Sequence, residues 1–277
     1  MKINSNTSSM FANRQLGDAY KSFSDSINRL SSGKRINKAA DDASGMTIAN
    51  RLNSQATGMG QAIKNANDAI SVIQIADGAL EEAAGLISTI RTKSIQASSD
   101  GQSHESRVAI QADINNALES LDRIAQTTSF NGQKLLSGAF TDKQFQVGAN
   151  PNETVKISIG SSDSVHLGSE KNGSLSSIDV TTFESSQKAI EIADAALEQV
   201  NMIRSSIGST HNQLASMINN LSSSQINIYA SESTIRDIDL AEESMNMSRL
   251  EMLTKSRTFA AAQANTSKKN VMALLGL

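Results

Sequence analysis

Residues 49–87 read ANRLNSQATGMGQAIKNANDAISVIQIADGALEEAAGLI. Small or apolar residues recur in this stretch at alternating intervals of three and four, which is the spacing of a helix face that packs against other helices. The phase holds over more than five heptads, although a polar Asp77 interrupts it. The large apolar members of this seam are Leu52, Met59, Ile63, Ile70, Ile73, Leu80 and Ile87. The stretch therefore predicts one long helix within a helical bundle.

The composition of the 277 residues also favours long helices, since there is one Pro and there are no Cys and no Trp. Proline interrupts helix interiors, so its scarcity permits helices of unusual length. The few aromatic residues, seven Phe and two Tyr, indicate thin helical layers rather than one thick core. The absence of Cys excludes disulfides, thiolate nucleophiles and Cys-ligated metal sites. A net charge of -3 gives no indication of nucleic-acid binding.

The sequence predicts neither a secretory signal nor a membrane span. The N-terminal residues MKINSNTSSM contain no apolar core of the kind that secretory signals carry. No stretch approaches the roughly 18 apolar residues of a membrane helix. We therefore expect no membrane insertion, and export, if it occurs, by a route that needs no cleaved signal.

Both ends of the chain carry helical faces that have no partner nearby in the sequence. The N-terminal face follows the three–four alternation and consists of Leu16, Tyr20, Phe23, Ile27 and Leu30. The C-terminal face repeats every seven residues and consists of Ile238, Met245, Met252 and Phe259. Amphipathic helices of this kind need a partner to cover the apolar face. Between the first two helices, Gly33 breaks the pattern, and Asp41 and Asp42 are suited to cap the second helix.

The second half of the chain resumes a heptad pattern near residue 183. One column is apolar throughout and consists of Ala193, Val200, Ile207, Leu214, Leu221 and Ile228. Its companion column is interrupted by Arg204, His211 and Gln225. Polar seam residues can fix the register and the partner of a helix, or the stripe can simply drift toward solvent. Both interpretations stay open here, and drift is preferred.

The middle of the chain contains a shorter helix followed by a change of period. The shorter helix presents Ile110, Ile114, Leu118, Leu121 and Ala125 on one face and ends before an Asn-Gly turn at residues 131–132. Residues 144–147 and 154–159 alternate with period two around the only Pro, Pro151. This pattern predicts a β-hairpin, followed by an exposed loop rich in Ser and Gly.

No group of residues supports enzymatic chemistry. His104, His166 and His211 lack any metal-ligand spacing, and Asp237 and Asp239 are not followed by the Gly and Glu of a calcium loop. No G-x-S-x-G motif is present. We expect a structural protein with no cofactor and no metal.

Three parts of the chain resemble bacterial flagellin. Residues 27–80, which begin INRLSSGKRINKAADDASG, resemble its N-terminal region, and residues 128–138, TSFNGQKLLSG, resemble a second signature of the family. The sequences MSR at 247–249, AQAN at 262–265 and VMALLGL at 271–277 resemble its C-terminal end. The resemblance covers residues 1–148 and 183–277, with the motifs in the order that the family has them.

The resemblance implies a mainly α fold, a long-helix coiled-coil bundle with paired N- and C-terminal helices and a small central β-hairpin region. Residues 1–40 with 236–277 are expected to form a discontinuous terminal coiled coil that is disordered in the monomer. Residues 41–137 with 181–235 are expected to form an inner helical bundle, and residues 138–180 its β-hairpin region. The large outer domains that many flagellins insert at this point are absent, which implies a short form.

The resemblance further implies an exported subunit that polymerises into the flagellar filament for swimming motility and is therefore secreted. The implied partners are other copies of the chain, an export chaperone on the C-terminal segment, the export apparatus, and hook-associated and cap proteins. The terminal faces given above are the implied self-assembly residues. Two alternatives stay open: a hook–filament junction protein, which shares the terminal helices, and a cytoplasmic coiled-coil adaptor.

One departure from the family concerns recognition by the host. The Toll-like receptor that senses many flagellins relies on an Arg, a Leu and a Glu of the inner helices, and the matching positions here are Thr89, Lys93 and Asp113. Loss of a bidentate Arg and a charge in place of a packed Leu both weaken such an interface. Weak receptor recognition is therefore expected.

Overall fold

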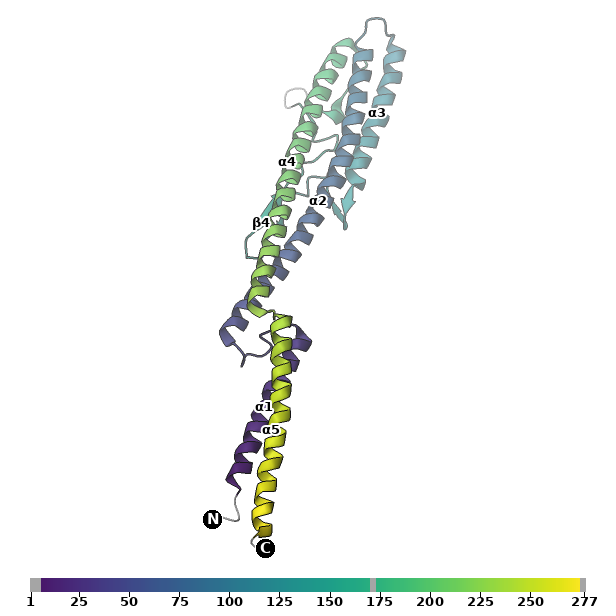
Figure 1. Cartoon of the computed structure of the whole chain (residues 1–277). Coiled ribbons are helices and arrows are strands. Elements are labelled where there is room, and N and C mark those ends of the chain that lie inside the picture. The colour runs from purple at the N-terminus through teal and green to yellow at the C-terminus, as the bar shows by residue number, and fades with distance from the viewer. Residues whose placement is uncertain (1–5, 170–172, 275–277) are drawn as a thin grey trace. The chain divides into compact units, whose positions relative to one another are not determined.

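A computed structural model describes the backbone of residues 6–169 and 173–274 and the side chains of these ranges as far as Ser267. Within these ranges the chain is built mainly from α1 (Thr7–Ser32), α2 (Ala43–Ala97), α3 (His104–Thr127), α4 (Phe183–Arg236) and α5 (Leu240–Leu274) (Figure 1). The mainly α fold predicted from the sequence is confirmed. The closing apolar residues 271–275 lie outside the side chains that the structure describes.

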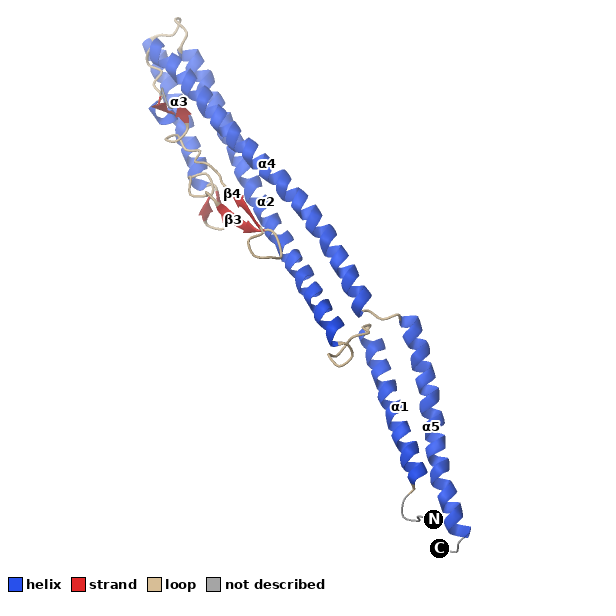
Figure 2. Cartoon of the chain, turned by 90° about the vertical axis from the view of Figure 1, so that its left-hand side faces the viewer, coloured by secondary structure: helices blue, strands red, loops and turns tan. Residues whose placement is uncertain are grey.

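The strands form three small antiparallel pairs between α3 and α4 (Figure 2). These are β1 (Ser129–Phe130) with β2 (Gln133–Lys134), β3 (Lys143–Gln146) with β4 (Thr154–Ile157), and β5 (Gly168–Ser169) with β6 (Gly173–Ser174), before the 3-10 turn η1 (Leu175–Ser177). The β3–β4 pair is the hairpin that the alternating residues predicted, with Phe145 opposite Val155. The turn between β1 and β2 has positive φ at both Asn131 (47°) and Gly132 (77°), which explains why Asn-Gly is used there.

The chain divides into two compact units. The first contains Met1–Gln55 and Ile226–Leu277, and its main feature is the pair α1 and α5, which lie side by side. The second contains Ala56–Gln225, in which α2, α3 and α4 run alongside one another with the strand pairs against them.

In the first unit, capping residues set the two ends of α1. The Asn6 side-chain oxygen accepts a hydrogen bond from the Ser9 N–H at 3.1 Å, so Asn6 caps the first turn. The helix ends at Gly33, whose φ of 67° and ψ of 10° are left-handed and are favoured by glycine. The break that the sequence indicated at Gly33 is therefore a helix cap.

The chain segments that follow α1 and α4 are joined by backbone hydrogen bonds within the first unit. The Arg35 N–H donates to the Arg236 carbonyl at 2.7 Å, and the Ile238 N–H donates to the Gly33 carbonyl at 3.2 Å. An isolated antiparallel bridge also links Lys34 and Asp237. These bonds satisfy backbone groups that the helix ends leave without intrahelical partners.

Two aspartates organise the turn before α2. Asp42 accepts from the Gly45 N–H at 2.9 Å and caps the helix as predicted. Asp41 instead accepts from the backbone N–H groups of Lys38 (2.9 Å) and Asn37 (3.0 Å). These two bonds stabilise the carboxylate and hold the pKa of Asp41 below its usual value.

The core of the second unit is shared by its helices and by the segment between α3 and α4. All five residues of the predicted α3 face are buried, so that prediction is confirmed. The largest fully buried side chains are Ile73, Leu80, Ile87, Ile90, Ile114, Leu121, Leu135, Leu136, Ile159, Leu167, Leu175 and Leu214. The described residues of the segment between α3 and α4 thus cover the helices with apolar side chains although they contain little regular structure.

Side chains of α3 hold this segment in place by hydrogen bonding to its backbone. Gln111 accepts from the Val180 N–H at 2.8 Å and donates to the Ile178 carbonyl at 3.1 Å. Asp122 accepts from both the backbone N–H and the hydroxyl of Ser164, each at 2.8 Å. Because the segment has few ladder partners, these bonds satisfy backbone groups that would otherwise lack them.

Candidate assembly surface

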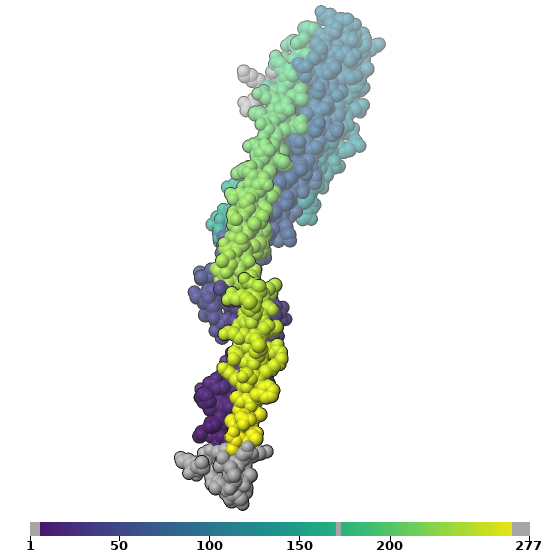
Figure 3. Space-filling model, in the orientation of Figure 1, coloured from purple at the N-terminus to yellow at the C-terminus, as the bar shows by residue number. Residues whose placement is uncertain are grey.

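Large apolar side chains lie exposed along α1 and α5, which Figure 3 shows side by side in purple and yellow. On α1 they are Met10, Phe11, Tyr20 and Ile27, and on α5 they are Leu240, Met245, Met252, Leu253 and Phe259. Phe259 is the most exposed of them at 78%. An accumulation of exposed apolar side chains on one helix pair marks an interaction surface. We refer to these nine residues as the terminal apolar surface.

The face between α1 and α5 combines small and polar side chains, which are fully buried, with large apolar ones, which are half-buried. Its buried members are Ser9, Ala19 and Ser26 on α1 and Glu243, Thr254 and Ala261 on α5. The Ser26 hydroxyl donates to the Glu243 carboxylate, and the Ser9 hydroxyl donates to the Asn265 side-chain oxygen at 2.5 Å. Polar contacts and close approach therefore hold the pair together with Leu16, Phe23 and Leu30, which are half-buried in the heptad column of Ser9.

The residues of the predicted terminal faces differ in how far they are buried. On α1, Leu16, Phe23 and Leu30 are half-buried, whereas Tyr20 and Ile27 are exposed. Toward the C-terminus, Ile238 is half-buried, and Met245, Met252 and Phe259 are exposed. Met245 lies two residues beyond the buried Glu243, which turns it by about 200° around the helix. Met245, Met252 and Phe259 therefore do not face α1.

The inner helices bury only part of the predicted seam. On α2, Ile73, Leu80 and Ile87 are buried, whereas Leu52, Met59, Ile63 and Ile70 are half-buried. On α4, Val200, Ile207 and Leu214 are buried, and Leu221 and Ile228 are half-buried. The second fully buried column of α2 is made of small residues that the prediction passed over, namely Ala62, Ala69, Ala76 and Ala83. Selecting the seam by side-chain size favoured Ile63 and Ile70 over the adjacent alanines.

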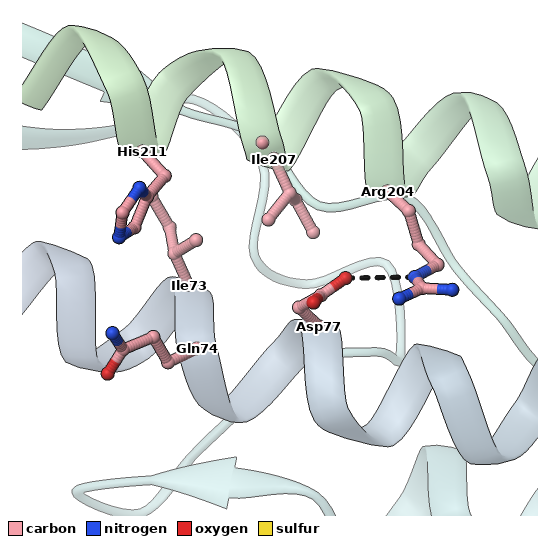
Figure 4. Close-up of a pocket in the computed structure, with 7 residues that line it drawn as sticks. Ile73, Gln74, Asp77, Arg204, Ile207 and His211 are labelled. Carbon is pink, nitrogen blue, oxygen red and sulfur yellow. Dashed lines mark hydrogen bonds and ion pairs between the residues drawn. The ribbon is translucent and has the colours of Figure 1, made fainter.

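Asp77, which interrupts the α2 seam, and Arg204, which interrupts the α4 column, lie opposite each other between the two helices, as Figure 4 shows. Arg204 Nε donates to Asp77 Oδ1 at 2.9 Å, and an Arg204 Nη2 to Glu81 Oε2 ion pair of 3.6 Å adds to it. The hydrogen bond that Arg204 donates to Asp77 raises the pKa of Arg204 above its usual value. His211 and Ile207 line the same open pocket beside the pair.

A second polar interruption of the same column also makes a bond between the helices. Gln225 Nε2 donates to the Ala56 carbonyl at 2.9 Å. Arg204 and Gln225 therefore have specific partners on α2, as expected for polar residues that set register. The preferred interpretation from the sequence was that the apolar stripe drifts toward solvent, and it does not account for these two hydrogen bonds.

Two of the three positions for which the sequence predicted altered receptor recognition contact each other. Lys93 Nζ and Asp113 Oδ2 form an ion pair of 2.6 Å between α2 and α3. Thr89 is exposed, and its hydroxyl donates to the Gly85 carbonyl one turn earlier at 3.0 Å. The Lys93 ammonium is thus occupied by an acidic partner in this chain.

Two other kinds of site are absent from the described part of the chain. No group of three or more His, Asp or Glu residues there is arranged to hold a metal ion. No helix among the described residues combines the length and apolar character that crossing a membrane requires.

Comparison with known families matches both ends of the chain. Residues 3–141 match the bacterial flagellin N-terminal helical region, and residues 190–275 match the bacterial flagellin C-terminal helical region. These ranges contain α1, α2, α3 and α5 and most of α4.

Individual relatives differ in how much of their length the chain spans. Flagellin A of Helicobacter pylori is 43% identical over 251 residues, which cover 90% of this chain and 49% of that protein. The flagellar filament 30.7 kDa core protein of Treponema maltophilum is 36% identical over 284 residues, which cover 99% of this chain and 100% of that protein. The chain therefore spans about half the length of the Helicobacter relative and the whole of the Treponema relative.

Among solved structures, a putative flagellar hook-associated protein from Vibrio parahaemolyticus has a similar fold. The TM-score is 0.60 at 12% identity, and the match covers 71% of this chain and all of that one. This likeness concerns the fold alone. With both helical regions matched and a relative aligned from end to end, the chain belongs to the bacterial flagellins, the structural, non-enzymatic proteins of the flagellar filament.

Proposed function

We propose that this chain polymerises into a helical flagellar filament through its terminal helices. The observation that carries the proposal is the terminal apolar surface, nine large side chains left exposed on α1 and α5. A second copy that covers this surface with a different surface of its own makes a head-to-tail contact. When the rotation between successive copies does not close, further copies keep adding to the end. Contacts of this kind build filaments rather than rings.

In the proposed mechanism, the terminal helices order fully only when subunits dock. The seam between α1 and α5 supports this step, because its buried members are mostly Ser, Thr, Ala and one Glu. Because its large apolar side chains, such as Leu16 and Phe23, are only half-buried, the seam offsets only part of the conformational entropy that ordering α1 and α5 costs. Isolated helices in water are marginal without tertiary packing. Assembly and folding of the ends are therefore coupled.

The proposed division of labour follows the expected domains. Residues 1–40 with 236–277 form the assembling part, residues 41–137 with 181–235 the inner bundle, and residues 138–180 its hairpin region. The inner part has an apolar core of its own, which includes Leu80, Leu121 and Leu214. It is thus expected to fold without the ends.

Removing the ends tests the proposal. A variant that lacks residues 1–40 and 236–277 should keep a cooperative helical unfolding transition by circular dichroism and should form no filaments in electron micrographs. The full chain, concentrated under salting-out conditions, is the control and should form long filaments. Polymerisation of the trimmed variant would contradict the mechanism, and failure of the full chain would favour a junction protein over a filament subunit.

The exposed surface of α5 also supports a chaperone partner before export. A cytoplasmic protein that covers Met245, Met252 and Phe259 would prevent early assembly and aggregation. We expect deletion of residues 236–277 to abolish capture of a chaperone in a pulldown from the producing cell, while deletion of residues 1–40 leaves it. The export apparatus and the hook-associated and cap proteins are the further partners of a subunit that reaches the filament.

Host-receptor recognition is proposed to be weak. The Lys93–Asp113 ion pair supports this, because a receptor would have to break it and desolvate both charges in order to use this face. A reporter-cell assay should show weak activation that rises when Thr89→Arg, Lys93→Leu and Asp113→Glu are combined. Activation by the unmodified chain equal to that of a strongly stimulatory flagellin would contradict the proposal.

A further inference from the structure

Thioether side chains are prominent on the terminal apolar surface. Four methionines of the described side chains are exposed: Met10 (69%), Met245 (69%), Met252 (66%) and Met202 (58%). The first three lie on α1 and α5, and the fourth lies on α4 in the second unit. Met46, Met59, Met217 and Met247 are half-buried. Reaction with a small oxidant in solution follows exposure, so the first four sulfurs are the ones that the described fold leaves most accessible.

Met245 and Met252 are seven residues apart on α5, and Phe259 follows after another seven. Two helical turns separate each pair, so the three side chains share one stripe of the helix. Met10 adds a third thioether on α1 beside the exposed Phe11. A stripe of this kind is apolar while its sulfurs are reduced, and each sulfur is one chemical step from becoming polar.

We propose that Met10, Met245 and Met252 form an oxidation site that controls assembly, with peroxides or hypohalous acids as the reacting class. In the peroxide reaction, the sulfur lone pair attacks one peroxide oxygen, an S–O bond forms, and the O–O bond breaks. The departing oxygen leaves as water after proton transfer, sulfur loses two electrons, and the peroxide gains them. The product is methionine sulfoxide, which a thiol-dependent sulfoxide reductase returns to the thioether.

The consequence for assembly rests on the proposed function of the terminal apolar surface. A sulfoxide carries a strongly polar S=O group, and burying it without a hydrogen-bond donor is unfavourable. A free subunit with oxidised sulfurs is therefore a poor substrate for addition to a filament. Once the surface is covered by another subunit, the same sulfurs are shielded. Oxidation thus acts on free subunits and spares finished filaments.

The experiment uses the full chain, hydrogen peroxide as the probe, and sedimentation of polymer to measure the critical concentration for assembly. Peptide mass spectrometry assigns sulfoxide to each methionine. Oxidised wild-type subunits should show a critical concentration about tenfold higher or more, on the scale of losing about 1.4 kcal/mol per subunit. Treatment with a methionine sulfoxide reductase should restore the original value.

Matched variants separate this site from general damage. The triple variant Met10→Leu, Met245→Leu and Met252→Leu keeps apolar volume and should assemble equally well with and without peroxide. The control Met202→Leu removes the accessible sulfur of the second unit and should remain as sensitive as the wild type. Equal loss of assembly in the triple variant, or unchanged assembly of wild type with all three sulfurs oxidised, overturns the inference. Failure of untreated wild type to polymerise overturns the proposed function instead, and reductase rescue of the wild type tests the inference without any variant.

Discussion

Replacing Phe259 by alanine separates the stability of one subunit from its ability to assemble. The Phe259 ring is 78% exposed in the single chain, so little of its apolar area contributes to folding. Substitutions at exposed positions of this kind usually change the free energy of unfolding by less than about 0.5 kcal/mol. The thermal unfolding midpoint of Phe259→Ala should therefore stay close to that of the unmodified chain.

Assembly should respond much more strongly. If a neighbouring subunit covers the ring, burial of a Phe side chain contributes about 1.5–3 kcal/mol, and this contribution is lost in Phe259→Ala. A loss of 1.4 kcal/mol per subunit is a factor of ten in an equilibrium constant. The critical concentration for polymerisation should rise by roughly 10- to 150-fold, as measured from the soluble protein left after sedimentation of the polymer.

The matched control is Phe183→Ala, at the start of α4 in the second unit. Phe183 is 46% exposed and lies away from the terminal apolar surface in the sequence, so its loss should leave the critical concentration within a small factor. The reasoning is refuted if Phe259→Ala and Phe183→Ala shift the critical concentration equally. It is also refuted if Phe259→Ala lowers the unfolding midpoint as much as a core substitution does.

Three further predictions concern the inner helices and the turn before α2. Leu80→Ala removes a fully buried side chain and should cost about 2–5 kcal/mol of unfolding free energy, measured by urea denaturation. A double-mutant cycle with Asp77→Ala and Arg204→Ala should give a coupling of about 0.2–1 kcal/mol, since both side chains are partly exposed; a coupling of zero would remove the pair as a stabilising contact. The pKa of Asp41 is lower in the folded chain than its usual value of 3.8, so its contribution is present above that value and is lost as the pH falls through the folded pKa. Amide hydrogen exchange of the two N–H groups that it accepts should accelerate there, and Asp41→Ala should show fast exchange at neutral pH.

The sequence predicted the helical architecture well, because heptad spacing and the near absence of Pro act locally. The α3 face, the Asp42 cap, the Asn-Gly turn and the β3–β4 hairpin all follow from short-range rules of periodicity and turn chemistry. Of the seven large residues in the predicted α2 seam, three are buried, namely Ile73, Leu80 and Ile87. The prediction missed the second buried column of α2, because its alanines give a weak hydrophobic signal even where they are buried.

Contacts between segments that lie far apart in the sequence could not be predicted from these short-range rules. The Arg204–Asp77 hydrogen bond joins two residues that each looked like a defect in its own column. The bridge between Lys34 and Asp237 has no sequence signal beyond a helix break at Gly33. Gln111 and Asp122 appeared as ordinary polar positions of α3, although they hold the loop backbone. Each of these bonds depends on which segments meet in space.

The sequence by itself determined that this chain forms long paired helices with a small hairpin region, and its motifs indicated the family. Only the tertiary structure decided which side of each terminal helix faces its partner. A heptad pattern fixes the angular spacing of apolar residues around a helix. It does not say which of two stripes on that helix packs against the partner helix and which stays exposed. Here the side chains that are fully buried on α1 and α5 are small or polar, because these allow close approach and hydrogen bonding, and Leu16, Phe23 and Leu30 are half-buried with them. Met245, Met252 and Phe259 lie on another stripe of α5 and remain on the outside of the pair.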